Sequence, residues 1–346
     1  MSDTKTSSAT RWAQFPPTQI SPIRLPPISF KILLAFATIY VIWGSTYLAI
    51  RIGVETLPPF LLAGSRFCIA GGLLYAVLRL SGAPRPSFVQ WKWAALIGTL
   101  MMFGGNGLVT WAQQDVPSGL AALLVATVPI WMIVLDVVFY GAERPRKTVI
   151  FGLAVGSAGL IFLVGPAEGA VQPLGAGVLL LAALSWAVGS LLNRSARLPD
   201  SPWMAAAMEM SAGGALMVTI AAFTGEWSGL DPAMVSARSI LALLYLTVFG
   251  SIISISAYVY LLRETSAAAV STYAFVNPVI ALALGWLTGE VVNQRTLTGA
   301  AMIVGSVVLI HWAKQRRPVD RGTVDEPTIE APALVCETPS RAGQAA

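Results

Sequence analysis

Arg66 and Glu209 are the charged residues whose positions in the sequence most directly suggest chemistry. Each lies inside a long apolar run, six or seven residues from its start, which is about 10 Å of helix at 1.5 Å per residue. A charged side chain is costly in such a segment and is therefore a candidate functional group. We expect both to face the interior of a helix bundle, either paired with each other or each bonded to neighbouring helices. A functional role that depends on these charges is one interpretation; a structural buried pair, or an Arg66 whose long side chain extends to the end of the apolar segment, is the other.

Pro129 and Pro278 are predicted to break two of the apolar helices. Proline has no backbone N–H, so the carbonyl one turn earlier loses its helical partner and must be satisfied elsewhere or exposed to a cavity. Asn277 precedes the second proline and could offer amide hydrogen bonds at that place. A simple kink that improves packing is the alternative at each proline.

The composition identifies the elements that must position these residues as membrane-spanning helices. The chain has 346 residues, of which 55% are apolar and only 11% are charged, whereas a soluble domain carries about a quarter charged residues. His311 is the only histidine and there are two cysteines, so we expect neither a metal site nor histidine-based catalysis. The basic residues are scattered between apolar runs, which argues against a nucleic-acid partner.

Ten apolar runs are each long enough to cross the bilayer as a helix. We predict an all-α polytopic membrane protein, with disordered tails at residues 1–31 and 314–346. Eighteen basic residues lie in the tails and in the loops on one side of the membrane, and three lie on the other side. Positive residues collect on the cytoplasmic side, so both termini are predicted to be cytoplasmic. The predicted spans are 32–50, 59–79, 92–112, 117–140, 147–165, 173–193, 203–224, 238–262, 266–288 and 296–313.

The sequence contains an internal repeat. A shift of 143 positions places Trp43 on Trp186 and Gly71 on Gly214, and a shift of 149 places Pro129 on Pro278. The same first shift relates Arg66 to Glu209. Each repeat, 32–165 and 173–313, contains five spans. Because five is odd, the second repeat enters the membrane from the opposite side, an arrangement that builds a binding site near the midplane in many transporters.

Several motifs resemble the EamA-type branch of the drug/metabolite transporter superfamily. They are residues 42–51 (IWGSTYLAIR) with Pro58-Pro59, then Arg66-Phe67, Gly105-Asn106-Gly107, Val116-Pro117-Ser118-Gly119, Asn277-Pro278 and Gly289-Glu290. The resemblance covers about residues 32–313. It implies two inverted five-helix repeats around a central cavity in the bacterial inner membrane. It also implies export of small molecules, since members it resembles export amino acids, aromatic ones included, and other metabolites.

The resemblance also implies which side chains could contact a substrate. Aromatic residues near the cavity of the resembled fold could stack on an apolar substrate or on a cation, and asparagines could hydrogen bond to it. For each of them packing in the core is the alternative. The candidates are Trp43, Tyr47, Asn106, Trp111, Trp186, Tyr258, Tyr273 and Asn277.

The leading functional hypothesis is a secondary transporter that exports amino acids, including aromatic and other bulky neutral ones. There is no glycine-rich ATP motif, and we expect no cofactor; the partners are a small-molecule substrate and the lipid bilayer, and a monomer is plausible. An exporter of drugs or other metabolites is the alternative. A cationic drug would require an acidic residue that Arg66 does not neutralise. An intramembrane enzyme would need catalytic pairs that the spans do not contain, and a membrane scaffold or sensor would be expected to carry a folded domain in its tails.

Overall fold

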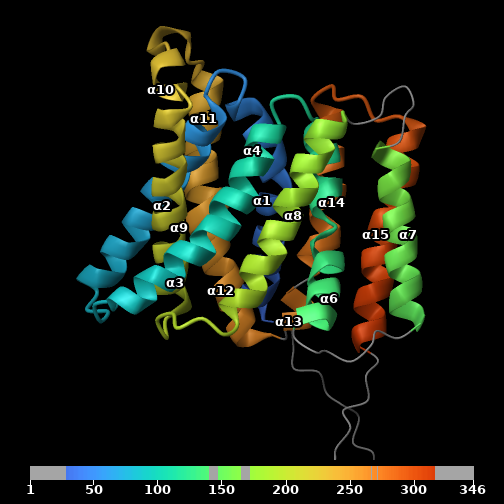
Figure 1. The fold of residues 1–346 in the computed structure, drawn as a ribbon, viewed down its shortest axis with the longest axis horizontal. Coiled ribbons are helices and arrows are strands. Elements are labelled where there is room, and N and C mark those ends of the chain that lie inside the picture. Colours follow the sequence, from blue (N-terminus) through green and yellow to red (C-terminus); the bar gives the residue numbers. More distant parts are fainter. Residues whose placement is uncertain (1–28, 140–146, 165–171, 266, 271, 316–346) are drawn as a thin grey trace, which may run out of the picture.

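The computed structural model describes residues 29–139, 147–164, 172–265, 267–270 and 272–315. Within these residues every regular element is a helix (Figure 1). Helices suit a bilayer because each satisfies its backbone hydrogen bonds internally. Seven helical spans are long and apolar enough to cross a membrane, and three shorter apolar helices accompany them. The predicted tails lie largely outside the described residues.

The first repeat begins with two unbroken helices and continues with two divided spans. The third span combines two α-helices with a π-helical segment, η1, and the fourth is divided at residues 126–127. The third span begins at residue 88 rather than the predicted 92, because Ser87 and Gln90 form a capping box there. The elements are α1 (Phe30–Gly53), α2 (Pro59–Leu80), α3 (Phe88–Gly98), η1 (Thr99–Gly107), α4 (Leu108–Ala112), α5 (Ser118–Val125), α6 (Val128–Phe139) and α7 (Lys147–Val164).

The second repeat follows the same plan, with a second π-helical segment, η3, in its third span. Two short helices, α10 and η2, lie in the connection before that span. The elements are α8 (Pro173–Asn193), α9 (Pro202–Phe223), α10 (Glu226–Gly229), η2 (Pro232–Met234), α11 (Ala237–Tyr245), η3 (Leu246–Ile253), α12 (Ser254–Glu264), α13 (Ala267–Val270), α14 (Tyr273–Leu287) and α15 (Gln294–Gln315).

The antiparallel pair α2 and α9 displays the inverted repeat in its contacts. A Cβ added to Gly71 would lie 2.6 Å from the backbone nitrogen of Ser211, and one added to Gly214 would lie 2.6 Å from that of Cys68. The shift of 143 residues converts the first contact into the second. The two helices therefore cross about a pseudo-two-fold axis near their midpoints, and only glycine allows this approach.

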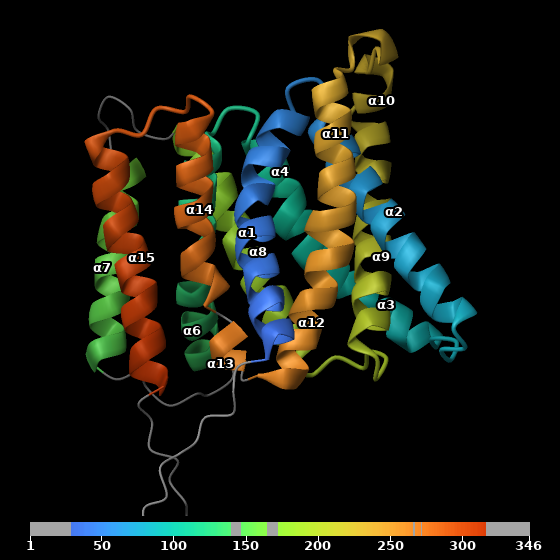
Figure 2. The same ribbon diagram turned by 180° about the vertical axis from the view of Figure 1, so that it is seen from behind.

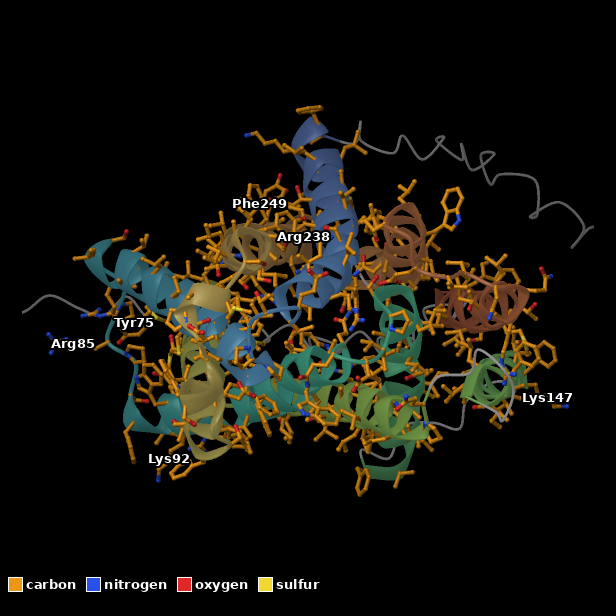
Figure 3. The ribbon with its side chains drawn as sticks, turned by 90° about the horizontal axis from the view of Figure 1, so that it is seen from above. Tyr75, Arg85, Lys92, Lys147, Arg238 and Phe249 are labelled. Atoms are coloured by element: carbon orange, nitrogen blue, oxygen red, sulfur yellow. The ribbon has the colours of Figure 1, made fainter. Side chains whose placement is uncertain are left out.

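Helices α7 and α15 form a second closely packed pair, which stands at one end of the molecule (Figure 1). Gly152 faces Ile310, Gly156 faces Ser306 and Gly159 faces Met302. Seen from above, Lys147 on α7 marks this end, and Arg85 and Lys92 mark the other (Figure 3).

Helix α1 runs through the middle of the molecule (Figure 2). It packs against α5 of its own repeat and against α11, α12 and α14 of the second. Residues on α1 are therefore placed to contact both repeats at once.

The two prolines have different effects on their helices. Pro129 is the second residue of α6 and directly follows the break at residues 126–127. Pro278 lies inside α14, which is continuous from Tyr273 to Leu287, so the expected break at Pro278 is not found. Helix α14 begins at Tyr273, after a turn at Thr272.

Candidate functional site

Arg66 is buried, with 5% of its surface exposed, where α2 meets the π-helical segment η3. Its Nε donates a hydrogen bond to Ser251 Oγ at 2.8 Å, and its Nη2 donates to the Gly250 carbonyl at 3.3 Å. The guanidinium carbon lies 4.5 Å from the centre of the Phe67 ring. Within the described residues no carboxylate oxygen lies within 4.0 Å of this guanidinium. Arg66 is thus a buried cation whose partners on the protein are neutral.

The π-helical geometry of η3 explains how a backbone carbonyl can serve Arg66. The wider turn of a π-helix disturbs the regular hydrogen-bond ladder, and such turns are frequent at functional sites. Ser251 Oγ donates to the Leu246 carbonyl at 3.1 Å, and Ser254 Oγ donates to the Phe249 carbonyl at 2.8 Å. Both bonds reach five residues back along the chain. The serines thereby satisfy carbonyls within the widened turn.

Glu209 is the residue equivalent to Arg66 in the second repeat, and it is also buried, with 6% exposed. Its Oε1 accepts a hydrogen bond from Asn193 Nδ2 at 3.0 Å. Because Gly64 faces Gly214 and Gly71 faces Ala207, Arg66 and Glu209 lie about three residues apart along the axis of the helix pair, roughly 5 Å, yet the two side chains form no ion pair. Of the two expected arrangements, a direct pair and separate bonds to neighbouring helices, the structure has the second.

Three of the predicted aromatic residues form one cluster, which we call the aromatic cluster: Trp43, Tyr258 and Tyr273. The Trp43 ring centre lies 5.4 Å from that of Tyr258 and 5.0 Å from that of Tyr273, and the two tyrosine ring centres are 6.3 Å apart. The edge-to-face geometry with Tyr273 is favourable for aromatic pairs. The cluster joins α1 of the first repeat to α12 and α14 of the second.

Thr46 links the aromatic cluster to Arg66. Its Oγ1 donates to the Trp43 carbonyl at 2.6 Å. Its methyl group faces Gly250, where an added Cβ would lie 3.0 Å away. Along η3 and α12, Ser251 and Tyr258 are seven residues apart, which is about 10 Å. The Arg66 guanidinium, held where α2 meets η3, therefore lies beside the interface of α1 with the eighth span, which contains Trp43 and Tyr258 of the aromatic cluster.

Asn277 lies beside the aromatic cluster and is buried, with 8% exposed. In the orientation of its amide that satisfies both neighbours, its nitrogen donates to the carbonyls of Tyr273 and Tyr40, each at 3.3 Å. Tyr40 Oη also hydrogen bonds to Thr272 Oγ1 at 2.5 Å. Asn277 thus connects α14 to α1 next to Pro278.

The other predicted aromatic residues pack against apolar clusters outside the aromatic cluster, although Tyr47 lies one turn after Trp43 on α1. Trp186 packs against Gly105 and the apolar cluster that contains Met102 and Met217, and Asn106 Nδ2 donates to the Met101 carbonyl at 3.4 Å. Tyr47 and Trp111 pack against a third cluster around Val109 and Leu179. Trp43 and Trp186, although matched across the repeat, therefore have different surroundings.

The residues that bond to Arg66 and Glu209 could not be identified from the sequence pattern alone. Gly250 and Ser251 lie in an apolar run, and the recurrence of Ser251 and Ser254 within that run was the available signal. Asn193 directly precedes Arg194 at the end of α8 and gave no comparable signal. The partners of a buried charge come from other helices, so their identity depends on packing.

An apolar groove of about 520 Å³ lies between α14 and α15. Every residue that lines it is apolar, and Val279, Trp286 and Leu297 are exposed on its walls. Its lining therefore suits apolar contacts rather than the binding of a polar solute. Within the described residues no three His, Cys, Asp or Glu side chains are grouped so as to hold a metal ion.

Comparison with known proteins identifies the family. The sequence pattern of the EamA-like transporter family matches residues 30–165 and again 173–312. An uncharacterized inner membrane transporter of Escherichia coli K12, YedA, is 42% identical over 286 residues, covering 82% of this chain and 92% of that protein. A probable terminal-alkyne amino-acid exporter of Streptantibioticus cattleyicolor is 27% identical over 283 residues, covering 81% and 93%.

A solved crystal structure shares the fold. It superposes with a TM-score of 0.58 and covers 83% of this chain and 99% of its own, at 22% identity. The double match of one family pattern agrees with the two repeats found in the α2 and α9 contacts. The chain belongs to the EamA-like transporter family, and it is a membrane transporter with two structural repeats rather than an enzyme.

Proposed function

We propose that the protein exports amino acids, aromatic and other bulky neutral ones, across the bacterial inner membrane by alternating access of its two repeats. The observation that carries this proposal is the buried Arg66, which has neutral partners only and lies beside the interface that contains Trp43 and Tyr258 of the aromatic cluster. A relative whose name describes amino-acid export and an inner-membrane relative support it.

Arg66 would receive the carboxylate of the substrate. A guanidinium has five N–H donors in a planar fork that matches a carboxylate. In this structure the Nε and the Nη2 nitrogen each donate one hydrogen bond to η3. A bound carboxylate would place a negative charge next to the Arg66 guanidinium, where the described residues place none. Burial makes such a charge-assisted bond stronger than it would be in water.

The aromatic cluster would receive the side chain of the substrate. It lies about two helical turns from Ser251, roughly 10 Å, a separation suited to an amino acid extended along α1. Stacking against Trp43, Tyr258 or Tyr273 favours aromatic and bulky apolar side chains over small polar ones. The substrate would then contact both repeats, so that their relative movement changes its access.

The membrane arrangement that we propose follows from the charges of the loops. Both termini lie in the cytoplasm, the boundaries of the repeats are 32–165 and 173–313, and a single chain forms the transport unit. The excess of basic residues on the side of the termini supports this orientation.

A second candidate function is the export of cationic drugs or related metabolites. Glu209 is buried, and its carboxylate accepts a hydrogen bond from the neutral Asn193 rather than from Arg66. An organic cation could therefore use Glu209 as its receptor, together with the aromatic cluster.

Counterflow of labelled phenylalanine in proteoliposomes tests both candidates. We expect saturable uptake that other bulky amino acids inhibit and that phenethylamine, which lacks the carboxylate, inhibits weakly. Arg66→Gln should abolish uptake, whereas the matched control Arg85→Gln, at an exposed arginine, should not. Strong inhibition by phenethylamine or by cationic drugs, with uptake retained in Arg66→Gln, would favour the second candidate. Uptake no greater than that of empty liposomes would remove the amino-acid assignment.

A further inference from the structure

The helices α2 and α5 begin without a capping side chain of their own. Their N-cap residues are Pro58 and Pro117, and neither forms a side-chain cap. The first backbone N–H groups of a helix have no partner within it, and the helix dipole places partial positive charge there. Each of these helix starts therefore needs an acceptor from elsewhere, and an anionic one is favoured.

A glutamate from the other repeat supplies each acceptor. Glu226 accepts from the amides of Phe60 and Leu61, at 3.3 and 2.9 Å, with one carboxylate oxygen each. Glu290 accepts from the amides of Ser118 and Gly119, at 2.8 and 3.3 Å, in the same two-oxygen manner. The two carboxylates thus make four hydrogen bonds across the boundary between the repeats.

The contacts of Glu226 and of Glu290 each join equivalent spans of the two repeats. Glu226 follows α9, the partner of α2, and Glu290 follows α14, which packs against α5. In both cases a loop of the second repeat caps the equivalent span of the first. Both lie on the side of the molecule where α1 and α9 end and α2 and α5 begin, the upper side in Figure 1, which we call the capped face.

Further polar contacts join the repeats at the capped face. Thr56, in the loop after α1, donates to Ser239 Oγ on α11 at 2.8 Å, and Ser239 Oγ donates to the Ile52 carbonyl at 3.0 Å. Arg238 lies 3.7 Å from Glu55, close to α1 in the view from above (Figure 3). The serine and threonine contacts are half-buried, so they exclude water from the capped face and also join the two repeats there.

The opposite face, in the part that the structure describes, differs at the start of α9. The start of α9, equivalent to that of α2, is capped by its own Ser201, which accepts from the Met204 amide at 3.4 Å. The loop after α2, residues 81–87, contains neither aspartate nor glutamate. On that face the described residues form one ion pair between the repeats. It joins Arg194 to Asp136 at 3.3 Å, and the arginine side chain is 58% exposed. Exposed ion pairs of this kind contribute little to stability.

We infer that Glu226 and Glu290 form a two-carboxylate latch that holds the capped face closed, and that it must release when this face opens in the transport cycle. The inference rests on the proposed alternating access, but on no particular substrate. The latch joins a rigid helix start to a loop of the other repeat, so separating the repeats leaves two carboxylates and four amides without their partners. Water can then satisfy these groups, which makes the latch reversible.

Hydrogen–deuterium exchange of the full-length protein in lipid nanodiscs tests the contacts. Glu226→Gln should speed exchange at residues 60–61 and Glu290→Gln at residues 118–119, each about tenfold or more. Glutamine keeps the size of the side chain but loses the charge and one acceptor. The matched control is Asp115→Asn, at an exposed carboxylate on the loop before α5, which should change neither segment. Unchanged exchange in both glutamate variants would overturn the latch.

A second measurement separates a latch from a local helix cap. Ala112 lies at the end of α4 below the capped face and is 2% exposed. In a chain whose two cysteines are replaced by serine, Ala112→Cys should react slowly with a membrane-impermeant maleimide. The double variant Glu226→Gln, Glu290→Gln should raise that rate at least tenfold, and each single variant should raise it less.

The outcomes distinguish this inference from the proposed function. Faster amide exchange with an unchanged maleimide rate would show that the glutamates are only helix caps, and would overturn the latch. Neither readout uses a substrate, so failure of phenylalanine counterflow leaves the latch test intact. If the double variant does not fold, the single variants decide, because each removes one of the two caps.

Discussion

Arg66 and Glu209 occupy equivalent positions in α2 and α9, yet each charged group bonds to a neutral partner on another helix rather than to its counterpart. Arg66 bonds to η3 and Glu209 to Asn193. A direct ion pair would tie the repeats together at the membrane centre and leave neither charge for a substrate. Separate neutral partners keep each charge available, and they make the two positions independently testable.

Arg66→Lys is expected to impair substrate binding although it preserves the charge. Lysine lacks the planar fork and has no counterpart of Nε, which donates to Ser251. We expect the KM for phenylalanine to rise about tenfold or more, since charged hydrogen bonds contribute about 1.5–3 kcal/mol. Counterflow rates at increasing substrate concentration measure this. Equal KM values for Arg66→Lys and the wild type would contradict carboxylate binding at this position.

Trp43→Ala should weaken transport of aromatic substrates more than that of aliphatic ones. The indole contacts both tyrosines of the aromatic cluster, and aromatic pairs contribute roughly 0.5–1.5 kcal/mol beyond the burial of their surface. Trp43→Phe should restore much of the loss. Trp227→Ala, at a tryptophan that is 52% exposed, is the control. A uniform loss for leucine and phenylalanine would indicate a packing role instead.

Glu209→Gln tests whether this carboxylate couples transport to protons. Glutamine retains an oxygen that can accept from Asn193 Nδ2, so the packing of α9 should be preserved while the titratable group is removed. We expect transport to lose its response to an imposed pH gradient, measured as the ratio of counterflow rates with and without the gradient. Asp136→Asn, at the weak surface pair with Arg194, is the control. An unchanged ratio in Glu209→Gln would exclude the coupling role.

Gly71→Ala and Gly72→Ala should have opposite effects on stability. A Cβ at Gly71 would lie 2.6 Å from the Ser211 nitrogen and 2.8 Å from the Ala207 carbonyl, both backbone atoms that cannot rotate away, whereas nothing lies within 4 Å of one at Gly72. We expect Gly71→Ala to lower the free energy of unfolding by roughly 1–3 kcal/mol. Gly72→Ala should raise it slightly, because alanine favours the helix. Thermal unfolding in detergent, followed by tryptophan fluorescence, compares them; equal Tm values would contradict the close α2 and α9 contact.

The orientation proposed for the membrane predicts which face reacts from outside the cell. In a chain without other cysteines, Ser228→Cys on the capped face should react with an impermeant maleimide in intact cells. Ser81→Cys on the opposite face should react only after permeabilisation. Both serines are exposed, so a difference reports sidedness rather than burial. The reverse pattern would place the termini outside.

Much of the fold could be predicted from the sequence because its signals are local or repeated. An uninterrupted apolar run of about 20 residues in a bilayer has one backbone solution, so spans such as 59–79 and 173–193 agree with the structure within a residue or two. The match of Gly71 with Gly214 and of Arg66 with Glu209 predicted paired roles for residues 143 positions apart. The two α2 and α9 glycine contacts have that relationship.

The local course of the divided spans was less predictable. A proline removes one hydrogen bond wherever it stands, but Pro129 follows a break while Pro278 lies within a continuous helix. Beside Pro278, the amide of Asn277 donates to the Tyr273 carbonyl and to the Tyr40 carbonyl on α1, a helix more than two hundred residues away in the sequence. Along the π-helical segment η3, Ser251 and Ser254 likewise donate to carbonyls five residues back, a pairing that the apolar run did not predict.

The sequence by itself determined that this protein is a helical membrane transporter with an inverted repeat, because burial of apolar segments in lipid and internal duplication are both visible in the order of residues. Which side chains meet depends on how the helices pack in three dimensions. That packing brings Arg66 to η3 and Trp43, but not Trp186, to the two tyrosines of the aromatic cluster. It also places Glu226 and Glu290 at the helix starts of the other repeat. The physical reason is range. A helix forms from hydrogen bonds between residues four apart, whereas a site forms from side chains whose separation in space is set by how ten helices pack.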